Sequence, residues 1–103
     1  TNMYIALEEI RLRVNKPIIL KFNQTDKVFD YHVTTEDILE SLRIICENSI
    51  YSYQNQICNG YITIKGGHRV GISGSVVIES NKVVNINYIS SLNFRVAKQI
   101  IRV

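Results

Sequence analysis

The feature that most constrains this chain is the clustering of its glycines between residues 60 and 97. All five glycines of the 103-residue sequence lie in this segment: Gly60, Gly66, Gly67, Gly71 and Gly74. Glycine tolerates positive φ angles and close backbone approach, but fixing it in a fold costs conformational entropy. Five glycines among β-forming residues therefore indicate a required backbone geometry, and we expect the functional surface to lie near them.

Two known binding loops can be tested against this glycine segment. A Walker A loop requires Lys and then Ser or Thr after its last glycine, because the lysine reaches the β- and γ-phosphates. Ile72 and Ser73 follow Gly71, so the segment is not a Walker A loop. The GxxG at residues 71–74 matches an RNA-binding KH loop, but its flanks predict strands rather than helices. We interpret Gly66-Gly67 as a hairpin turn, and Gly71 and Gly74 as marks of a bulge or tight crossing.

Periodicity predicts strands before the glycine segment and again within it. Polar and apolar residues alternate over residues 8–14, and Pro17 then fixes a turn before strands at 18–22 and 28–33, with a polar turn at 23–27 between them. After residue 60 the period of two returns at 61–65, 70–78 and 83–89, with a turn at 80–82, and continues to 97. Ile62 and Ile64 are expected to pair with Val70 and Ile72.

Between these strands the pattern becomes helical. A threonine at residues 34–35 followed by Glu36 and Asp37 is typical of a capped helix start, and apolar residues then recur at helical spacing to about Asn48. Residues 49–58 predict a second, shorter helix that ends at Gly60. The chain is therefore predicted to be one α+β domain, residues 1–103, with mainly antiparallel β-meanders of about 3 + 3 strands and a central helical pair packed on the sheet.

Composition excludes several classes of protein. With 46% hydrophobic and 20% charged residues the chain is an ordinary globular sequence, and no apolar run approaches the length of a membrane span. The net charge of +3 comes from basic residues spread along the chain, which disfavours nucleic-acid binding. Cys46 and Cys58 are expected to be reduced thiols of a cytoplasmic protein. Neither cysteine is spaced with His32 or His68 as metal ligands are, so no metal site and no catalytic residue is assigned.

Three separated motifs together resemble the stage III sporulation protein AA family. They are the EIRLR of residues 9–13 with Lys16-Pro17, the GYIT and GGHRVG of residues 60–71 with Gly74, and the ISSLNFR of residues 89–95. The resemblance implies a mother-cell ATPase of endospore-forming bacteria, similar to the hexameric motor ATPases of type II and type IV secretion. It also implies that this chain is the family's N-terminal domain, which precedes the ATPase domain. The absence of an initiating methionine and of any Walker motif leads us to expect a non-enzymatic segment of that longer protein.

What the resemblance implies for function is an accessory domain of an ATPase that energises a channel between mother cell and forespore. ATP and magnesium would serve the whole protein, with no cofactor in this segment. The expected partners are further copies in a hexamer and a membrane subunit of the channel, with the protein on the cytoplasmic side of the mother cell and peripheral to the membrane. The alternatives are a protein-docking module for a membrane subunit and, third, a nucleic-acid-binding module.

Arginines are the candidate site residues of such a domain, because guanidinium groups bind phosphate oxygens in pairs. Arg69 follows the glycine turn and Arg95 lies on the polar side of the last strand, while Arg11 and Arg13 are second choices. These four are the candidate nucleotide-sensing residues. The alternative is that Arg69 and Arg95 form surface salt bridges with acidic residues at positions 8, 9 or 79.

Overall fold

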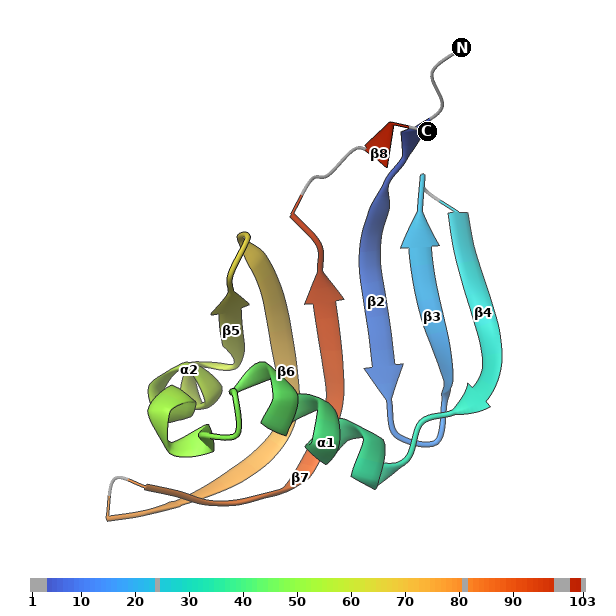
Figure 1. Ribbon diagram of the computed structural model, residues 1–103. Coiled ribbons are helices and arrows are strands. Elements are labelled where there is room, and N and C mark those ends of the chain that lie inside the picture. The colour runs from blue at the N-terminus through green and yellow to red at the C-terminus, as the bar shows by residue number, and fades with distance from the viewer. Residues whose placement is uncertain (1–3, 24, 81, 98–100, 103) are drawn as a thin grey trace.

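A six-stranded antiparallel sheet with helices on one face makes up most of the fold (Figure 1). The computed structural model describes residues 4–23, 25–80, 82–97 and 101–102. The strand order is β4-β3-β2-β7-β6-β5, and a separate pair of short strands, β1 and β8, joins the two ends of the described chain. The strands are β1 (Tyr4–Ile5), β2 (Leu7–Arg13), β3 (Pro17–Phe22), β4 (Thr25–His32), β5 (Tyr61–Ile64), β6 (His68–Glu79), β7 (Lys82–Arg95) and β8 (Ile101–Arg102).

The prediction of an α+β fold with a mainly antiparallel sheet is confirmed, and the structure shows how the two predicted meanders are joined. β2 of the first meander pairs with β7 of the second, with Leu12 opposite Leu92, so the two meanders form one continuous sheet. The segments predicted at 83–89 and beyond are a single strand, β7. Alternation of polar and apolar residues indicates which face of the sheet a residue occupies, but not which strand it pairs with. The pairing of β2 with β7, which we call the β2–β7 junction, therefore could not be predicted from the local sequence.

The first helix begins where its capping signal predicts. Thr34 is the N-cap of α1 (Thr35–Ile45): its side chain accepts a hydrogen bond from the Asp37 amide at 3.1 Å, and the Asp37 carboxylate accepts one from the Thr34 amide at 2.9 Å. This reciprocal capping box satisfies two amide groups that a helix start leaves free. The helix ends before the predicted Asn48, because Glu47 and Asn48 adopt positive φ angles of 54° and 63°.

The predicted second helix is in fact two short pieces. Residues Ile50–Tyr53 form the 3₁₀-helix η1, and Gln54–Asn59 form α2. Gly60 ends α2 with a left-handed φ of 90°, as the sequence indicates. The longest described helix, α1, has 11 residues, and no helix among the described residues is long and apolar enough to cross a membrane.

The glycine segment builds the β5–β6 hairpin and a bulge. Gly66 and Gly67 both have positive φ, and the loop also includes Lys65. The expected pairing of Ile62 with Val70 is confirmed, but the expected pairing of Ile64 with Ile72 is wrong. Antiparallel strands run in opposite directions, so Ile64 lies opposite His68. The predicted bulge is confirmed at Gly74, where φ is 125° and the β6–β7 register shifts. Gly71 instead keeps regular pairing on both sides.

Two other predicted turns touch residues outside the described chain. The turn at residues 80–82 includes Asn81, and the polar turn at 23–27 includes Gln24, neither of which is described. The turn predicted at 23–27 extends too far toward the C-terminus, because strand β4 already begins at Thr25.

The core lies between the helices and the β5–β7 half of the sheet. α1 packs across β7, and α2 packs on β5 (Figure 1). Burial raises the pKa of the Cys46 thiol in this core to about 11. The buried apolar cluster consists of Val33, Ile38, Leu42, Cys46, Ile57, Ile62, Val70, Ile89 and Leu92.

Candidate functional site

All four predicted arginines lie on the open face of the sheet, opposite the helices. Ile10, Val70 and Phe94 share one row of the pairing, in which Val70 belongs to the core and Phe94 packs against it. Because side chains alternate along a strand, the neighbouring residues Arg69 and Arg95 point to the other face. Arg69 is paired directly with Arg95, and Arg95 in turn with Glu9.

The next row across the strands leaves a hollow beside these arginines. Gly71 is paired with Asn93, and Asn93 with Arg11. Gly71 has no side chain to stand on the open face, and the result is a hollow of about 220 Å³ lined by Arg69, Gly71, Asn93 and Arg95. A Cβ on Gly71 would lie 3.8 Å from the Asn93 carbonyl oxygen, which is an ordinary contact. A small side chain therefore fits at Gly71 and would occupy the hollow.

Glu9 is the buried acid beside this hollow. Arg11 Nε donates a hydrogen bond to its carboxylate, Asn93 Nδ2 donates at 3.4 Å, and Arg95 Nε lies 3.9 Å away. Burial alone would raise the pKa of Glu9, but the hydrogen bonds from Arg11 and Asn93 and the positive charges of Arg11 and Arg95 outweigh it. The pKa of Glu9 is lowered as a result. Glu9 is thus ionised and holds Arg11 in place.

Arg69 and Arg95 form a like-charge pair with little neutralisation. Like charges directly opposite each other across two strands are unfavourable. The Arg95 side chain is 72% exposed and reaches Glu9 only at long range. Arg69 lies over the Tyr61 ring at 3.9 Å, and among the described residues no carboxylate forms a salt bridge with it. The salt-bridge alternative therefore fits Arg95 in part and does not fit Arg69 within the described chain.

The other site residues differ in position. Arg13 is exposed, one row beyond Arg11 and opposite Ser91, away from the lining of the hollow. Sequence reasoning missed Asn93, whose buried Oδ1 has no hydrogen-bond partner among the described residues. The alternation of residues 92–96 does place Asn93 on the same face as Arg95, but it does not mark Asn93 as a site residue. His68, assigned no catalytic role, accepts a hydrogen bond at Nδ1 from the Ala97 amide at 2.9 Å.

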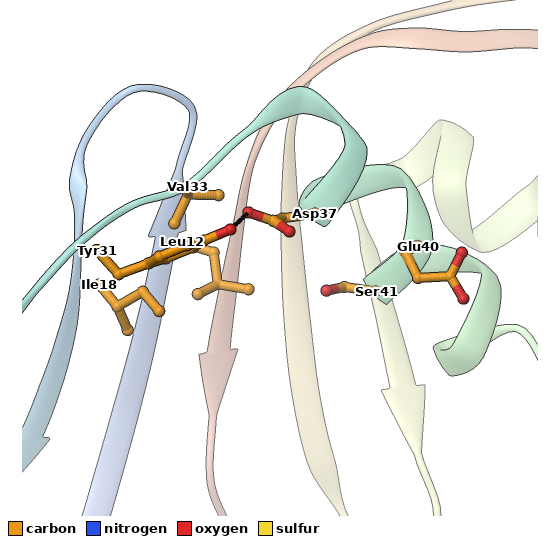
Figure 2. Close-up of a pocket in the computed structure, with 7 residues that line it drawn as sticks. All are labelled: Leu12, Ile18, Tyr31, Val33, Asp37, Glu40 and Ser41. Carbon is orange, nitrogen blue, oxygen red and sulfur yellow. Dashed lines mark hydrogen bonds between the residues drawn. The ribbon is translucent and has the colours of Figure 1, made fainter.

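A second hollow lies on the helix side of the sheet, between α1 and the β2–β4 strands (Figure 2). Its volume is about 400 Å³, and Tyr31 forms one wall, donating a hydrogen bond to Asp37. That bond raises the pKa of Tyr31, and it lowers the pKa of Asp37 together with the hydrogen bond from the Thr34 amide. We call this the α1 hollow; it is lined by Leu12, Ile18, Tyr31, Val33, Asp37, Glu40 and Ser41. No group of three or more His, Cys, Asp or Glu side chains suited to a metal ion occurs in the part of the chain that the structure describes.

Comparison with known proteins gives the chain its family. The family model described as "Sporulation stage III, protein AA" matches residues 1–103. The chain belongs to this family. It is 35% identical over 96 residues to the Stage III sporulation protein AA of Bacillus subtilis (strain 168). No solved structure matches the chain.

Membership of the sporulation stage III protein AA family supports a role in sporulation. The match covers 93% of this chain but only 31% of the Bacillus subtilis relative. The chain thus spans about a third of the length of that relative.

Proposed function

We propose that this chain is an accessory N-terminal domain of a sporulation motor ATPase, one that assists subunit assembly and reports the state of bound nucleotide. The observation that carries the nucleotide part is the pairing of Arg69 with Arg95 beside the hollow at Gly71. Two guanidinium groups facing each other across two strands gain most from a shared anion, and phosphate oxygens accept bidentate hydrogen bonds from arginine.

The size of the hollow limits what it can hold. At about 220 Å³ it has room for a phosphate group but is smaller than the usual pocket for a whole organic ligand. In this proposal the base and ribose are therefore bound by the remainder of the longer protein, and this domain contacts only phosphate. The domain then moves as a rigid body between two positions, according to whether the terminal phosphate of the nucleotide is present.

The wider setting belongs to the same proposal. The longer protein would use ATP and magnesium, assemble as a hexamer, and contact a membrane subunit of a channel between mother cell and forespore from the cytoplasmic side. The segment alone would not hydrolyse ATP. Hydrolysis by the full-length protein beside this segment alone is the direct comparison, and activity in the segment would contradict the assignment.

The arginine site is tested in the full-length protein by Arg69→Ala and Arg95→Ala. A hydrogen bond to a charged group contributes about 1.5–3 kcal/mol, so each change is expected to weaken ATP binding by about tenfold to a hundredfold. Arg43→Ala is the matched control, because Arg43 lies on α1 and pairs with Glu40 at 3.4 Å. ATP affinity that is unchanged in both site variants would refute the nucleotide role.

A docking module is the second candidate, favoured by the large apolar side chains exposed at Val28, Ile78 and Tyr88. Arg69→Glu separates the two functions. A nucleotide-reporting domain loses nucleotide-dependent behaviour, whereas a docking module loses assembly and keeps hydrolysis. The third candidate, a nucleic-acid module, would be favoured by strong, salt-dependent binding of the protein to a generic duplex.

A further inference from the structure

The end of β7 lies beside the turn of the β5–β6 hairpin, at one end of the sheet (Figure 1). Arg95, the last residue of β7, is paired with Arg69, the second residue of β6. If this antiparallel ladder continued by two residues, the Ala97 amide would donate to the carbonyl of Gly67. Gly67 instead belongs to the turn, where its φ is 84° and its amide donates to Ile64 at 3.1 Å. The ladder therefore ends before Ala97, and the Ala97 amide needs another acceptor.

The imidazole of His68 is that acceptor. The Ala97 amide donates a hydrogen bond to His68 Nδ1 at 2.9 Å. The preceding amide, that of Val96, donates in the opposite direction, to the Glu8 carbonyl oxygen on the β2 side at 3.0 Å. Two consecutive amides thus hold the chain after β7 to both neighbouring strands, one through a main-chain acceptor and one through a side chain.

The two glycines of the turn leave room for this contact. A Cβ on Gly66 would lie 3.0 Å from Nε2 and 3.2 Å from Cδ2 of the His68 ring, closer than an ordinary contact. A Cβ on Gly67 would lie 3.7 Å from the Cβ of Ala97. The ring therefore packs against the main chain of Gly66 with Nδ1 toward Ala97. Each residue of the Gly66-Gly67-His68 sequence has a part in holding the chain after β7.

The bond depends on the protonation state of the ring. An amide N–H can donate only to a ring nitrogen that carries no proton, so the imidazole is neutral with its proton on Nε2. When both ring nitrogens of His68 are protonated, two donors face each other and the bond is lost. Histidine is the side chain whose charge ordinarily changes between about pH 5 and pH 8. His68 is only partly buried, so protons from solvent can reach it.

We propose that the hydrogen bond between His68 and Ala97 is a pH-sensitive switch at the end of β7. Neutral His68 holds the segment after β7 against the hairpin turn, and protonated His68 releases it. The switch lies directly beside the arginine pair, because His68 precedes Arg69 and Ala97 follows Arg95 by two residues. In the proposed function the chain continues from here to the ATPase domain. Release then loosens the connection through which a rigid-body movement of this domain would pass.

Charges of both signs lie on the elements packed around His68. The charged residues are Lys65 of the turn, Glu8 of β2, Glu47 after α1, and Arg69 and Arg95, which point to the opposite face of the sheet. These five charges stay the same when only His68 is replaced. A difference between variants of His68 therefore belongs to the imidazole.

The test is hydrogen exchange at single amides of the full-length protein, measured by mass spectrometry with electron-transfer fragmentation. The protection factor of an amide is its exchange rate in an unstructured peptide at the same pH, divided by the observed rate. We expect the protection factor of the Ala97 amide to fall about fivefold or more between about pH 8 and about pH 5, because its hydrogen bond is lost. The Val96 amide is the internal control and should keep its protection, because its acceptor is a main-chain carbonyl.

Two variants separate the proton from the ring. His68→Asn places a side-chain oxygen where Nδ1 lies, and this acceptor does not titrate, so Ala97 should stay protected at both pH values. His68→Leu removes the acceptor, so the protection factor of Ala97 should be equally low at both. Native protection of Val96 in the two variants shows that the end of the sheet is still folded.

The switch uses the proposed function only for its consequence, so the two can fail separately. Arg69→Ala tests the nucleotide role through ATP binding and should leave exchange at Ala97 unchanged. Three results would overturn the switch. They are equal protection of Ala97 at both pH values in the native protein, native protection of Ala97 in His68→Leu, and a loss at Val96 as large as the loss at Ala97, which would mean that the whole end of the sheet opens.

Discussion

The two halves of the sheet have similar sequences and very different surroundings. β5, β6 and β7 lie under α1 and α2 and provide the sheet residues of the core, such as Ile62, Val70 and Leu92, all of which are fully buried. β3 and β4 contribute no buried side chain, and every residue of β4 is exposed. β2 contributes one, the acid Glu9.

The difference shows that alternation does not measure burial. Residues 18–22 are as apolar as residues 61–65, yet they contribute no buried side chain, whereas Ile62 is fully buried. A sheet face is buried when another layer covers it, and the described chain provides that layer for half of its sheet only.

The largest expected effect is a loss of stability, and it is measured by truncating one leucine in each half of the sheet. Leu92→Ala removes a fully buried side chain from β7 and should lower the free energy of unfolding by about 2–5 kcal/mol. Leu20 on β3 is only partly buried, so Leu20→Ala should cost about 1 kcal/mol. Urea unfolding of both variants measures the difference. Equal costs would mean that β3 is covered as fully as β7.

A second contrast uses two glycines of β6 only three residues apart. A Cβ on Gly74 would lie 2.3 Å from the Tyr88 carbonyl oxygen, and φ is 125°, so Gly74→Ala should cost about 2–4 kcal/mol. Gly71→Ala meets only ordinary contacts and should change stability by less than about 0.5 kcal/mol. The same variant fills part of the arginine hollow and should weaken ATP binding. Similar unfolding midpoints for the two variants would argue against the bulge.

The third and smallest expected effect is that of replacing Glu9, the buried acid of β2 on the open face of the sheet. Its pKa is lowered in the folded protein, so the ionised form adds stability above the ordinary glutamate pKa of about 4.3. This contribution is lost as the pH falls through the lower folded pKa. Glu9→Gln should lower the free energy of unfolding by about 1 kcal/mol at pH 7. Below about pH 4 the difference in free energy of unfolding between the variant and the native protein should become smaller. A constant deficit from pH 7 to pH 3 would show that the charge of Glu9 is not involved.

Local signals predicted the elements of this fold well. The alternation of residues 8–14 located β2, and Thr34 with Asp37 located the start of α1, because both signals act within a few residues. The β2–β7 junction was missed because its pairing joins residues some eighty positions apart. The helix after Ser49 was overestimated because η1 and α2 together contain only one buried side chain, Ile57.

The candidate site was predicted residue by residue but not as a surface. Arg11, Arg69 and Arg95 are scattered in sequence, and only the strand order brings them to one face. The argument against nucleic-acid binding was that the basic residues are spread along the sequence. Because the fold brings three arginines to one face, that argument is weaker for the folded protein. The hollow itself depends on Gly71 pairing with Asn93, which no local pattern specifies.

The β2–β7 junction also determines the order in which this chain can fold during synthesis. β2, β3 and β4 leave the ribosome first, but the strand that flanks β2 ends at Arg95. Contacts between residues so distant in sequence form slowly, because the loop between them must first be closed. β2, β3 and β4 must therefore wait, with an unpaired edge on β2, until nearly the whole segment has been made. This waiting period is when the chain is most open to aggregation and to binding by chaperones.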